Sequence, residues 1–320
     1  MKVVVLGDVM LDVYEFCSTD ASKLINSEKA GKRAYTAQNT VRALGGAGNV
    51  AANLASLGVS ASLIGVTGND GRYFTMQQIS DELGLRHCFI RDRSRPTTTK
   101  NRLYIDNEYI LRRDDESAAP IEHETGMTLL NELLCELDGA QAVILSDYAK
   151  GIFSEQFAQQ VISACRDKNV PTIVDFKPVN RGVFHGASLI APNSVEAEAI
   201  LPGFNEGIDA GTGAERVLRT LHGKLGCERL VVTLGERGIC GFDGSSIFHV
   251  PANKVTEVDA VGCGDTVRAV LATAHALGFS LKDAASLAND AAAVIVQKPA
   301  TAMVDQGELV TFLEAKGPGQ

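Results

Sequence analysis

The segment 259–266 reads Asp-Ala-Val-Gly-Cys-Gly-Asp-Thr and leads into an apolar stretch of helical pattern. Gly262, Cys263 and Gly264 are small enough for their backbone N–H groups to converge on one anion. The first N–H groups of a helix also lack intrahelical partners and lie at the positive end of its dipole. Asp265 follows in the same turn, where it can take a proton from a hydroxyl while the nest holds a phosphoryl group. The segment indicates phosphoryl transfer, or else an ordinary helix start whose aspartate complements the dipole.

Two further groups of residues suit a polyhydroxylated ligand. Asp8 and Asp12 come directly after the first apolar run, where two carboxylates can accept hydrogen bonds from hydroxyl groups. Gly45 and Gly46 precede a helical pattern that carries Asn49, so the backbone can approach a sugar whose hydroxyls bond the amide. The alternative for the two carboxylates is a solvated turn.

The same glycines match the dinucleotide-binding fingerprint only weakly. Gly46, Gly48 and Ala51 have its spacing, but the preceding stretch 36–44 is polar and reads poorly as a buried strand. The first apolar strand, 2–6, is not followed by the fingerprint, and the chain contains no P-loop motif. We therefore discount a nicotinamide-dependent oxidoreductase and a P-loop enzyme.

Charged residues near expected strand ends extend the candidate site. Lys100 and Arg102 occupy alternate positions of a strand pattern and share one face, which suits a phosphate on the substrate. The alternative is the charged solvent face of a two-stranded lid. Asp147, Lys150 and Asp175 follow apolar strands. The carboxyl ends of parallel strands meet at one edge of a sheet, where ligands bind.

Another set of residues suits a nucleotide. Asn193 and Glu196 are three apart and share one face of a helical turn, where they can hold waters around Mg²⁺ on a nucleotide phosphate. As a helix start, the pair is equally ordinary. Thr233, Gly235 and Gly238 end another apolar strand, and the glycines leave room for a nucleotide to lie there.

Short apolar runs alternate with longer helical patterns along most of the chain. Strands are predicted at 2–6, 61–66, 141–146, 171–175, 188–191 and 229–234. Helices are predicted at 49–57, 154–168, 194–201, 214–225, 264–277 and 281–297. Near-continuous apolar strands separated by helices are typical of a parallel sheet covered on both faces. The fold class is therefore α/β.

Two hairpins interrupt this alternation. The stretch 100–112 alternates around Asp106 and Asn107, a dipeptide that suits a two-residue turn. With parts of 12–42, this hairpin is expected to form a small β lid. A second hairpin is predicted around Asp243 and Gly244.

Bulk properties exclude several classes of function. The formal net charge of -9 disfavours nucleic acid and anionic membrane as partners. The seven cysteines are scattered without a C-x-x-C pair, which suits a reducing compartment and gives no zinc site. No segment approaches 18 uninterrupted apolar residues, and the amino terminus opens as a strand. A cytoplasmic protein outside the membrane is predicted.

With these motifs in order, the chain resembles the ribokinase-type, or PfkB, carbohydrate kinase family. The resemblance is carried by Gly45, Gly46, Gly48, Asn49 and Asn53, by Asn193 and Glu196, and above all by Asp259, Gly262, Gly264, Asp265 and Thr266. It implies a three-layer α/β/α sandwich with a mostly parallel central sheet and a small β-sheet lid. The kinase domain would span 1–315, with the lid built from parts of 12–42 and 92–115, and 316–320 would be a frayed tail.

The resemblance also implies a role for each matching residue. Asp265 would be the catalytic base, and the amides of Gly262, Cys263 and Gly264 the anion hole. The sugar-side residues would be Asp8, Asp12, Gly45, Gly46, Asn49, Lys100, Arg102, Asp147, Lys150 and Asp175. The nucleotide-side residues would be Asn193, Glu196, Thr233, Gly235, Gly238 and Asn289, with Asn193 and Glu196 reaching Mg²⁺ through water. Relatives often hold a monovalent cation such as K⁺ near an aspartate equivalent to Asp259.

Within the family, the segments 7–12, 98–102 and 146–151 are similar to the heptose 7-phosphate kinases of lipopolysaccharide-core biosynthesis. Those enzymes use ATP and magnesium to phosphorylate the anomeric hydroxyl of D-glycero-D-manno-heptose 7-phosphate. The resemblance implies the same reaction here, in a homodimer formed through the β lid. The alternatives are a family member that acts on another sugar, sugar phosphate or nucleoside, and a nucleotide- or sugar-binding regulator without turnover.

Three features depart from the family pattern. The segment 22–30 stands where the heptose kinases usually carry a proline-rich stretch, and it would belong to the lid or a dimer contact. The other two are single residues. Cys263 stands where an alanine is usual, and a thiol at a helix amino terminus is expected to have a lowered pKa and to be sensitive to oxidation. Arg268 stands one helical turn after Asp265, where an apolar residue is usual. It is placed either to pair with Asp265 or to reach a phosphate.

Overall fold

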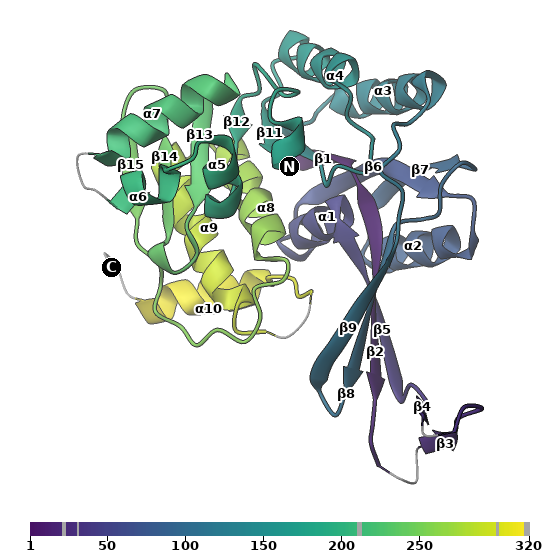
Figure 1. The fold of residues 1–320 in the computed structure, drawn as a ribbon. Helices are drawn as coiled ribbons and strands as arrows, with labels where there is room; N and C mark the ends of the chain where they lie inside the picture. Colours follow the sequence, from purple (N-terminus) through teal and green to yellow (C-terminus); the bar gives the residue numbers. More distant parts are fainter. Residues whose placement is uncertain (21–23, 31, 210–212, 299–300, 317–320) are drawn as a thin grey trace.

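The computed structural model describes residues 1–20, 24–30, 32–209, 213–298 and 301–316. Apolar runs pair into a nine-stranded sheet in the order β15-β14-β13-β12-β11-β10-β1-β6-β7 (Figure 1). Its strands are β1 (Lys2–Gly7), β6 (Ser60–Gly68), β7 (Arg86–Asp92), β10 (Ala142–Ser146), β11 (Thr172–Asp175), β12 (Leu189–Ile190), β13 (Arg229–Thr233), β14 (Ile239–Phe242) and β15 (Ile247–Val250). From β13 to β7 the strands are parallel, and β14 and β15 add the predicted antiparallel hairpin at one edge.

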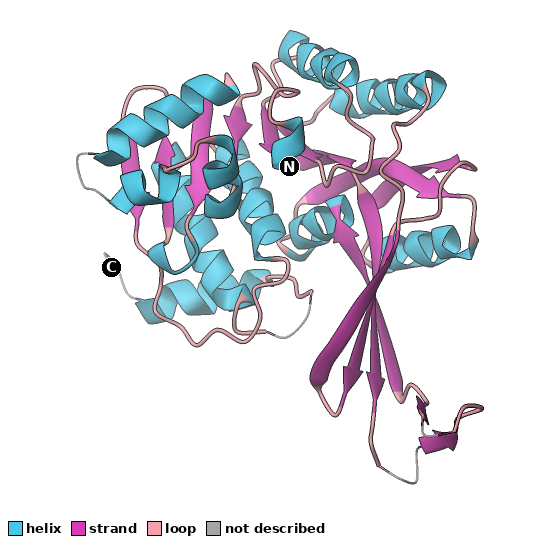
Figure 2. Cartoon of the chain, in the orientation of Figure 1, coloured by secondary structure: helices cyan, strands magenta, loops and turns pink. Residues whose placement is uncertain are grey.

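Helices cover both faces of this sheet (Figures 1 and 2). The helices are α1 (Ala47–Ser56), α2 (Gly71–Glu82), α3 (His123–Leu137), α4 (Glu155–Asp167), α5 (Ser194–Ile200), α6 (Phe204–Asp209), α7 (Gly213–Leu225), α8 (Cys263–Ala276), α9 (Leu281–Ile295) and α10 (Gln306–Lys316). Side chains of one face pack with α1, α2, α8, α9 and α10, and those of the other with α3, α4, α5, α6 and α7.

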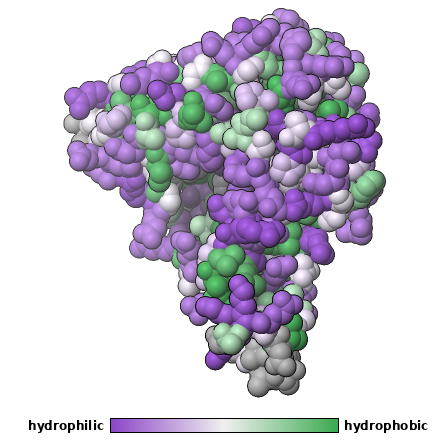
Figure 3. All heavy atoms as spheres, turned by 45° about the vertical axis from the view of Figure 1, so that its right-hand side comes forward, coloured by the Kyte–Doolittle hydropathy of each residue, from purple (hydrophilic) through white to green (hydrophobic). Residues whose placement is uncertain are grey.

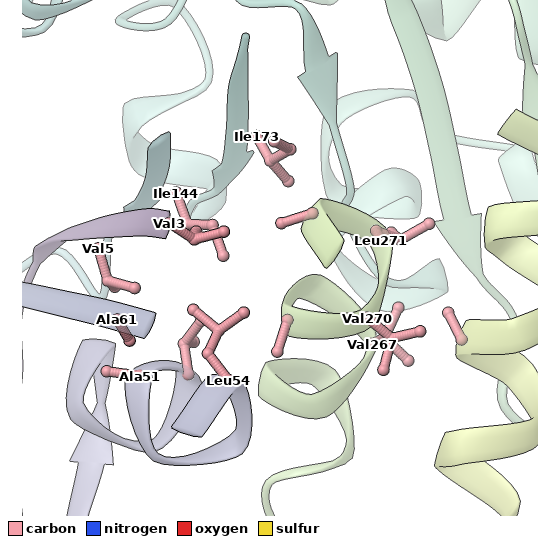
Figure 4. Close-up of a cluster of buried hydrophobic side chains, with 14 of the residues drawn as sticks. Val3, Val5, Ala51, Leu54, Ala61, Ile144, Ile173, Val267, Val270 and Leu271 are labelled. Carbon is pink, nitrogen blue, oxygen red and sulfur yellow. The ribbon is translucent and has the colours of Figure 1, made fainter. Parts of the chain in front are cut away.

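The central strand β1 shows why two apolar layers form. Val3 and Val5 enter the cluster with α1 and α8, whereas Val4 and Leu6 enter the opposite cluster. Neighbouring side chains of a strand point to opposite faces, so a strand buried on both sides must be apolar throughout. Figure 4 shows the first cluster, in which residues of α1 and α8 meet those of β1, β6, β10 and β11. The three-layer α/β/α fold predicted from the sequence is confirmed.

A smaller four-stranded sheet projects from the sandwich (Figure 1), and we call it the lid. Its order is β5-β2-β8-β9, with β2 (Val9–Cys17), β5 (Asn39–Gly46), β8 (Thr99–Ile105) and β9 (Glu108–Asp115). A separate two-stranded sheet joins β3 (Leu24–Asn26) to β4 (Arg33–Tyr35). The stretch 36–44, which reads poorly as a buried strand, mostly forms β5, whose outer half is exposed. Residues 21–23 and 31 of the expected lid region lie outside the described residues.

The lid carries exposed apolar side chains. Tyr109, Ile110 and Leu111 of β9 are between 45% and 51% exposed, and Val41 of β5 is 43% exposed. Figure 3 shows hydrophobic surface gathered on this projecting part of a largely hydrophilic molecule. Exposed apolar side chains gathered on one part of a protein are typical of an interaction site.

Of the expected frayed tail 316–320, the structure describes only Lys316, which is helical. Lys316 belongs to α10, and its ammonium lies 2.7 Å from a carboxylate oxygen of Asp290. Residues 317–320 of the expected tail lie outside the described residues. In the described part of the chain, every helix is too short or too polar to cross a membrane.

The turn between β8 and β9 yields a prediction. Asp106 and Asn107 have φ of 49° and 67°, which is the left-handed pair that a type I′ hairpin turn requires. Asn107→Val should therefore cost about 1 kcal/mol, because a β-branched side chain is strained in this conformation. Amides of β8 and β9 are then expected to exchange hydrogen about fivefold faster. Asn107→Gly is the control, and equal exchange in both variants would contradict the assigned turn.

Candidate active site

The glycine turn, residues 262–265, begins α8 where this helix packs against α1 and α9. Gly262 has φ 84°, a left-handed conformation that favours glycine, and it directly precedes the first helical residue, Cys263. Asp265 lies in the first turn of α8 with 6% of its surface exposed. The helix start predicted from the glycine pattern is therefore present.

One side of the glycine turn faces a cavity of about 230 Å³, which we call the Asp265 cavity. Its lining includes Gly262 and Asp265 together with five residues expected on the sugar side: Asp12, Gly46, Asn49, Lys100 and Arg102. Five further lining residues were not anticipated as site residues: Met10, Arg112, Tyr148, Val261 and Thr301. Asp265, the residue predicted to be central to the site, is therefore largely buried, yet it lines this cavity.

Asp265 is held by two hydrogen-bond donors. The amide Nδ2 of Asn49 donates to one carboxylate oxygen over 2.8 Å, and the hydroxyl of Tyr148 donates to the other over 2.8 Å. Asn53 fixes Asn49 by donating to its backbone oxygen, and Thr266 in turn donates to Asn53. Burial raises the pKa of Asp265, while the nearby Arg268 cation and the two donors oppose that rise.

Tyr148 is a site residue that sequence reasoning missed. Its ring lies between two ammonium groups, with Nζ of Lys100 5.5 Å and Nζ of Lys177 5.0 Å from the ring centroid. Burial, together with the neighbouring carboxylates Asp265 and Asp175, raises the pKa of the phenol well above its usual value. Tyr148 therefore stays protonated and donates to Asp265. Its position in the sequence, directly after Asp147 at the end of a strand, could have identified Tyr148 as a candidate site residue.

Three cations of the lid reach the Asp265 cavity. β8 pairs with β2 so that Lys100 lies opposite Asp12, and with β9 so that Arg102 lies opposite Arg112. Arg102 bonds a carboxylate oxygen of Asp12 over 2.8 Å and lies over the ring of Tyr14. Burial lowers the pKa of Lys100. A lid strand with alternate cations on one face suits an anionic group of a ligand, as the sequence predicts.

Five residues expected on the sugar side do not line this cavity, and Asp8 is one of them. One oxygen of the Asp8 carboxylate accepts from the backbone N–H groups of Tyr148 and Lys150, over 2.6 and 3.1 Å. The other oxygen is buried and has no hydrogen-bond partner among the described residues. Burial and the nearby Asp147 carboxylate raise the pKa of Asp8 to about 7. In this structure Asp8 anchors the turn that carries Tyr148.

The other four have structural contacts of their own. Asp147 accepts from the backbone N–H of Ala149, which has φ 57°, and from the side chain of Asn180. Lys150 pairs with Glu116 over 2.7 Å. Gly45 lies against Asp12, because a Cβ there would come within 2.6 Å of that carboxylate. Asp175 is paired with Arg268 in the interior.

The opposite side of the glycine turn faces a second cavity of about 230 Å³, which we call the Asn289 cavity. Cys263 and Gly264 line it, together with four residues expected on the nucleotide side: Thr233, Gly235, Gly238 and Asn289. It shares Glu236, Ala252, Asn253, Val255 and Glu257 with an adjoining, more open cavity of about 1220 Å³. The glycine turn thus separates a cavity beside the lid from a larger space between β13, β14 and α9.

Asn193 and Glu196 do not line the Asn289 cavity. They form a reciprocal cap of α5, in which each side chain accepts from the other's backbone N–H over 2.9 Å. The remaining oxygen of Glu196 bonds Nζ of Lys177 over 2.7 Å. Asn193 is nevertheless paired with Thr233 of the cavity wall in a parallel bridge. The two residues therefore form an ordinary helix start, as the alternative interpretation held. This helix start lies next to the wall of the Asn289 cavity.

Cys263 differs from its predicted chemistry. Its thiol was expected to have a lowered pKa at the helix amino terminus, but burial and the carboxylates of Glu257, Asp259 and Asp265 raise its pKa to about 12. The expected oxidation-sensitive thiolate is therefore wrong, because desolvation outweighs the helix dipole. Asp259 accepts the backbone N–H of Val261 over 2.9 Å and so shapes the entry to the glycine turn.

Comparisons with known proteins agree with this geometry. The profile of the family described as "pfkB family carbohydrate kinase" matches residues 1–306. Proteins named "Bifunctional protein HldE" from Bradyrhizobium diazoefficiens and Methylobacillus flagellatus are 36% and 35% identical over 96% and 98% of the chain. The chain spans only 62% and 63% of the length of these two relatives.

Solved structures show the same fold. Phosphofructokinase-2 from Escherichia coli in complex with potassium superposes with a TM-score of 0.79 at 17% identity, over 98% of each chain. Ribokinase from Arabidopsis thaliana, complexed with ribose and ATP, gives 0.73 at 21% identity, again over 98% of each chain. The ribokinase-like architecture expected from the sequence is confirmed.

The environment of Cys263 predicts its reactivity. Because only the thiolate reacts, a thiol whose pKa is raised to about 12 should alkylate slowly at pH 8. The free and exposed Cys135 provides the internal comparison. Mass spectrometry after brief iodoacetamide treatment is expected to find modification at Cys135 and little at Cys263. Preferential modification of Cys263 would contradict the assigned burial.

Proposed function

This chain belongs to the pfkB family of carbohydrate kinases, and from that premise we propose that it phosphorylates the anomeric hydroxyl of D-glycero-D-manno-heptose 7-phosphate with ATP. The single observation that carries the proposal is the glycine turn, which separates the Asp265 cavity from the Asn289 cavity. A donor in one cavity and an acceptor in the other would meet at the amino terminus of α8, where a phosphoryl group is best stabilised.

The acceptor is proposed to bind in the Asp265 cavity. Asn49 and Asp12 offer an amide and a carboxylate to sugar hydroxyls, and the lid cations approach from the other side. Lys100 has no carboxylate within 4.0 Å among the described residues, so its ammonium is available to a second anion. A sugar that already carries a phosphate fits this charge pattern better than a neutral sugar does.

The donor is proposed to bind in the Asn289 cavity and the wider cavity that adjoins it. Thr233, Gly235 and Gly238 would face the nucleotide, and Asn289 supports the wall by donating to the backbone oxygen of Pro251 over 2.9 Å. The phosphate chain would then point toward Cys263 and Gly264 at the glycine turn.

Magnesium is proposed to lie on the side of Glu196. Each oxygen of this buried carboxylate has one hydrogen-bond donor and keeps a second lone pair, so Glu196 can hold a water of an Mg²⁺ ion, as can the amide of Asn193. This fits an ion that keeps several waters, and when bound it neutralises charge on the nucleotide phosphates. The carboxylate of Asp259 supplies the oxygen chemistry for a monovalent cation such as K⁺, which we propose there.

The transfer step follows from the position of Asp265. Its carboxylate takes the proton of the sugar hydroxyl as the sugar oxygen attacks the γ-phosphorus in line. The bond to the β-phosphate breaks, ADP leaves with that electron pair, and the amides of residues 262–264 stabilise the charge on the transferred group. Asn49 and Tyr148 orient the carboxylate throughout.

The lid is proposed to have two tasks. It carries the cations that hold the substrate phosphate, and closure over the sugar would exclude water that otherwise hydrolyses ATP. Its exposed apolar strand β9 suits a homodimer in which two lids pack together.

A panel of acceptors tests the substrate. Heptose 7-phosphate, another sugar phosphate, ribose and a nucleoside would each be offered with Mg·ATP while ADP release is followed. Turnover of heptose 7-phosphate alone supports the proposal. Turnover of another acceptor identifies a different kinase of the family, and binding of ATP without turnover of any acceptor identifies a regulator.

Removal of the proposed base gives the first functional prediction. Asp265→Asn should lower kcat about 10²–10⁴-fold, because the amide cannot accept the proton. Asp167→Asn, at an exposed position in α4, is the matched control. In the wild type, the raised pKa of Asp265 predicts that activity declines as pH falls through a range above the usual value of about 4. Full activity of Asp265→Asn would refute the role.

The lid cations give a second functional prediction. Lys100→Met should raise KM for the phosphorylated sugar about 10–100-fold, since a charged hydrogen bond to phosphate contributes about 1.5–3 kcal/mol. The same change should leave KM for ATP unaltered. Lys168→Met, which removes a surface ion pair with Asp138, serves as the control. An unchanged KM for the sugar phosphate would show that Lys100 does not hold that phosphate.

A further inference from the structure

Arg268 is a buried cation that the proposed reaction does not yet use. It lies one turn after Asp265 in α8 with 5% of its surface exposed. Its Nη2 bonds a carboxylate oxygen of Asp175 over 2.6 Å and the backbone oxygen of Ala191 over 3.2 Å. Its Nε is buried without a hydrogen-bond partner in the described part of the chain. The guanidinium is thus only partly satisfied.

Stability alone is a poor reason for this arrangement. Asp175 is 1% exposed, and burial raises its pKa to about 7 although Arg268 opposes the rise. Desolvation of two buried charges commonly offsets their attraction, and an apolar pair of similar volume often serves as well or better. The orphaned Nε adds a further cost. A partly satisfied ion pair one helical turn from Asp265 therefore points to a functional contribution.

The other nitrogen of the guanidinium lies against the glycine turn. A Cβ built on Gly264 would come within 2.0 Å of Nη1 of Arg268, so the guanidinium fills the space that a side chain would take. Gly264 also lines the Asn289 cavity, where we place the phosphate chain of the donor. Arg268 therefore packs against the backbone of the proposed anion hole, without lining the cavity proposed for the donor.

Arg268 also acts on the charge of the site. The groups around Asp265 are Asp12 from β2, Asn49 from α1, Tyr148 after β10, Lys100 and Arg102 from β8, Arg112 from β9, and Asp175, Lys177 and Glu196 at the ends of β11 and α5. Burial has the largest effect on the pKa of Asp265 and raises it, whereas the charge of Arg268 has the largest effect in the opposite direction. The cation thus favours the ionised carboxylate that accepts a proton.

We propose that Arg268 is a positioning residue for phosphoryl transfer, which packs against Gly264 and so holds the glycine turn in place, and which puts a permanent positive charge near the transferred group. This inference rests on the proposed function and extends it to a residue outside the two cavities. Asp175 is its counter-ion, which holds the guanidinium against the turn. The rival account makes Arg268 only the charge partner of Asp175.

Three variants separate these accounts. Arg268→Met leaves Asp175 unpaired, so both stability and kcat should fall. The double variant Arg268→Met with Asp175→Asn removes both charges and should recover the melting temperature. If Arg268 positions the transfer, kcat of the double variant stays about tenfold or more below wild type, KM for the sugar changes less than about twofold, and the acidic limb of the pH profile moves to higher pH. Arg268→Lys keeps a cation and should retain an intermediate kcat.

The outcomes distinguish this inference from the proposed function. A wild-type protein that phosphorylates no acceptor overturns both. An active wild type whose double variant keeps full kcat and the same pH profile overturns only the role of Arg268. If the double variant fails to fold, Arg268→Lys decides the matter, because a wild-type kcat and pH profile in that variant refutes the need for a fixed guanidinium against Gly264.

Discussion

A carboxylate held almost out of water at the start of α8 is the constraint on which the rest of the structure depends. In the proposed reaction Asp265 accepts a proton in its ionised form, yet burial favours its protonated form. Asn49 and Tyr148 donate to it, and Arg268 opposes the rise of its pKa. Each comes from a different element, so the charge state of one residue depends on the mutual packing of α1, α8 and the strand ends.

The parallel sheet supplies that packing. Alternating apolar residues of β1 pack into both layers. In the layer shown in Figure 4, α1 packs against α8. α1 also contacts the lid strands β2 and β5, and the glycine turn lines the same cavity as lid residues. The polar residues then collect where the strands end. The turn separates two cavities of similar volume, which is the arrangement that transfer between two bound molecules requires.

Much of this could be predicted from residue types and spacing. The alternation of elements, six of the helices and the hairpin at Asp106 follow from local chemistry, whereas the helices α2, α3, α6 and α10 were not predicted. Two features could not be predicted: the buried position of Asp8, and Tyr148 as the partner of Asp265. Both depend on contacts between residues more than 100 positions apart in the chain. The pKa of Cys263 was predicted wrongly for a related reason. The sequence shows that this residue begins a helix, but it does not show that the thiol is buried.

The junction of the two sheets has a mechanical consequence. β1 runs through Asp8 directly into β2, so one uninterrupted stretch of backbone belongs first to the core and then to the lid. The Asp8 carboxylate also accepts hydrogen bonds from the turn that carries Tyr148, and the phenol of Tyr148 donates to Asp265. A movement of the lid relative to the core would therefore bend the backbone at Asp8, the residue that also holds the turn whose phenol donates to Asp265.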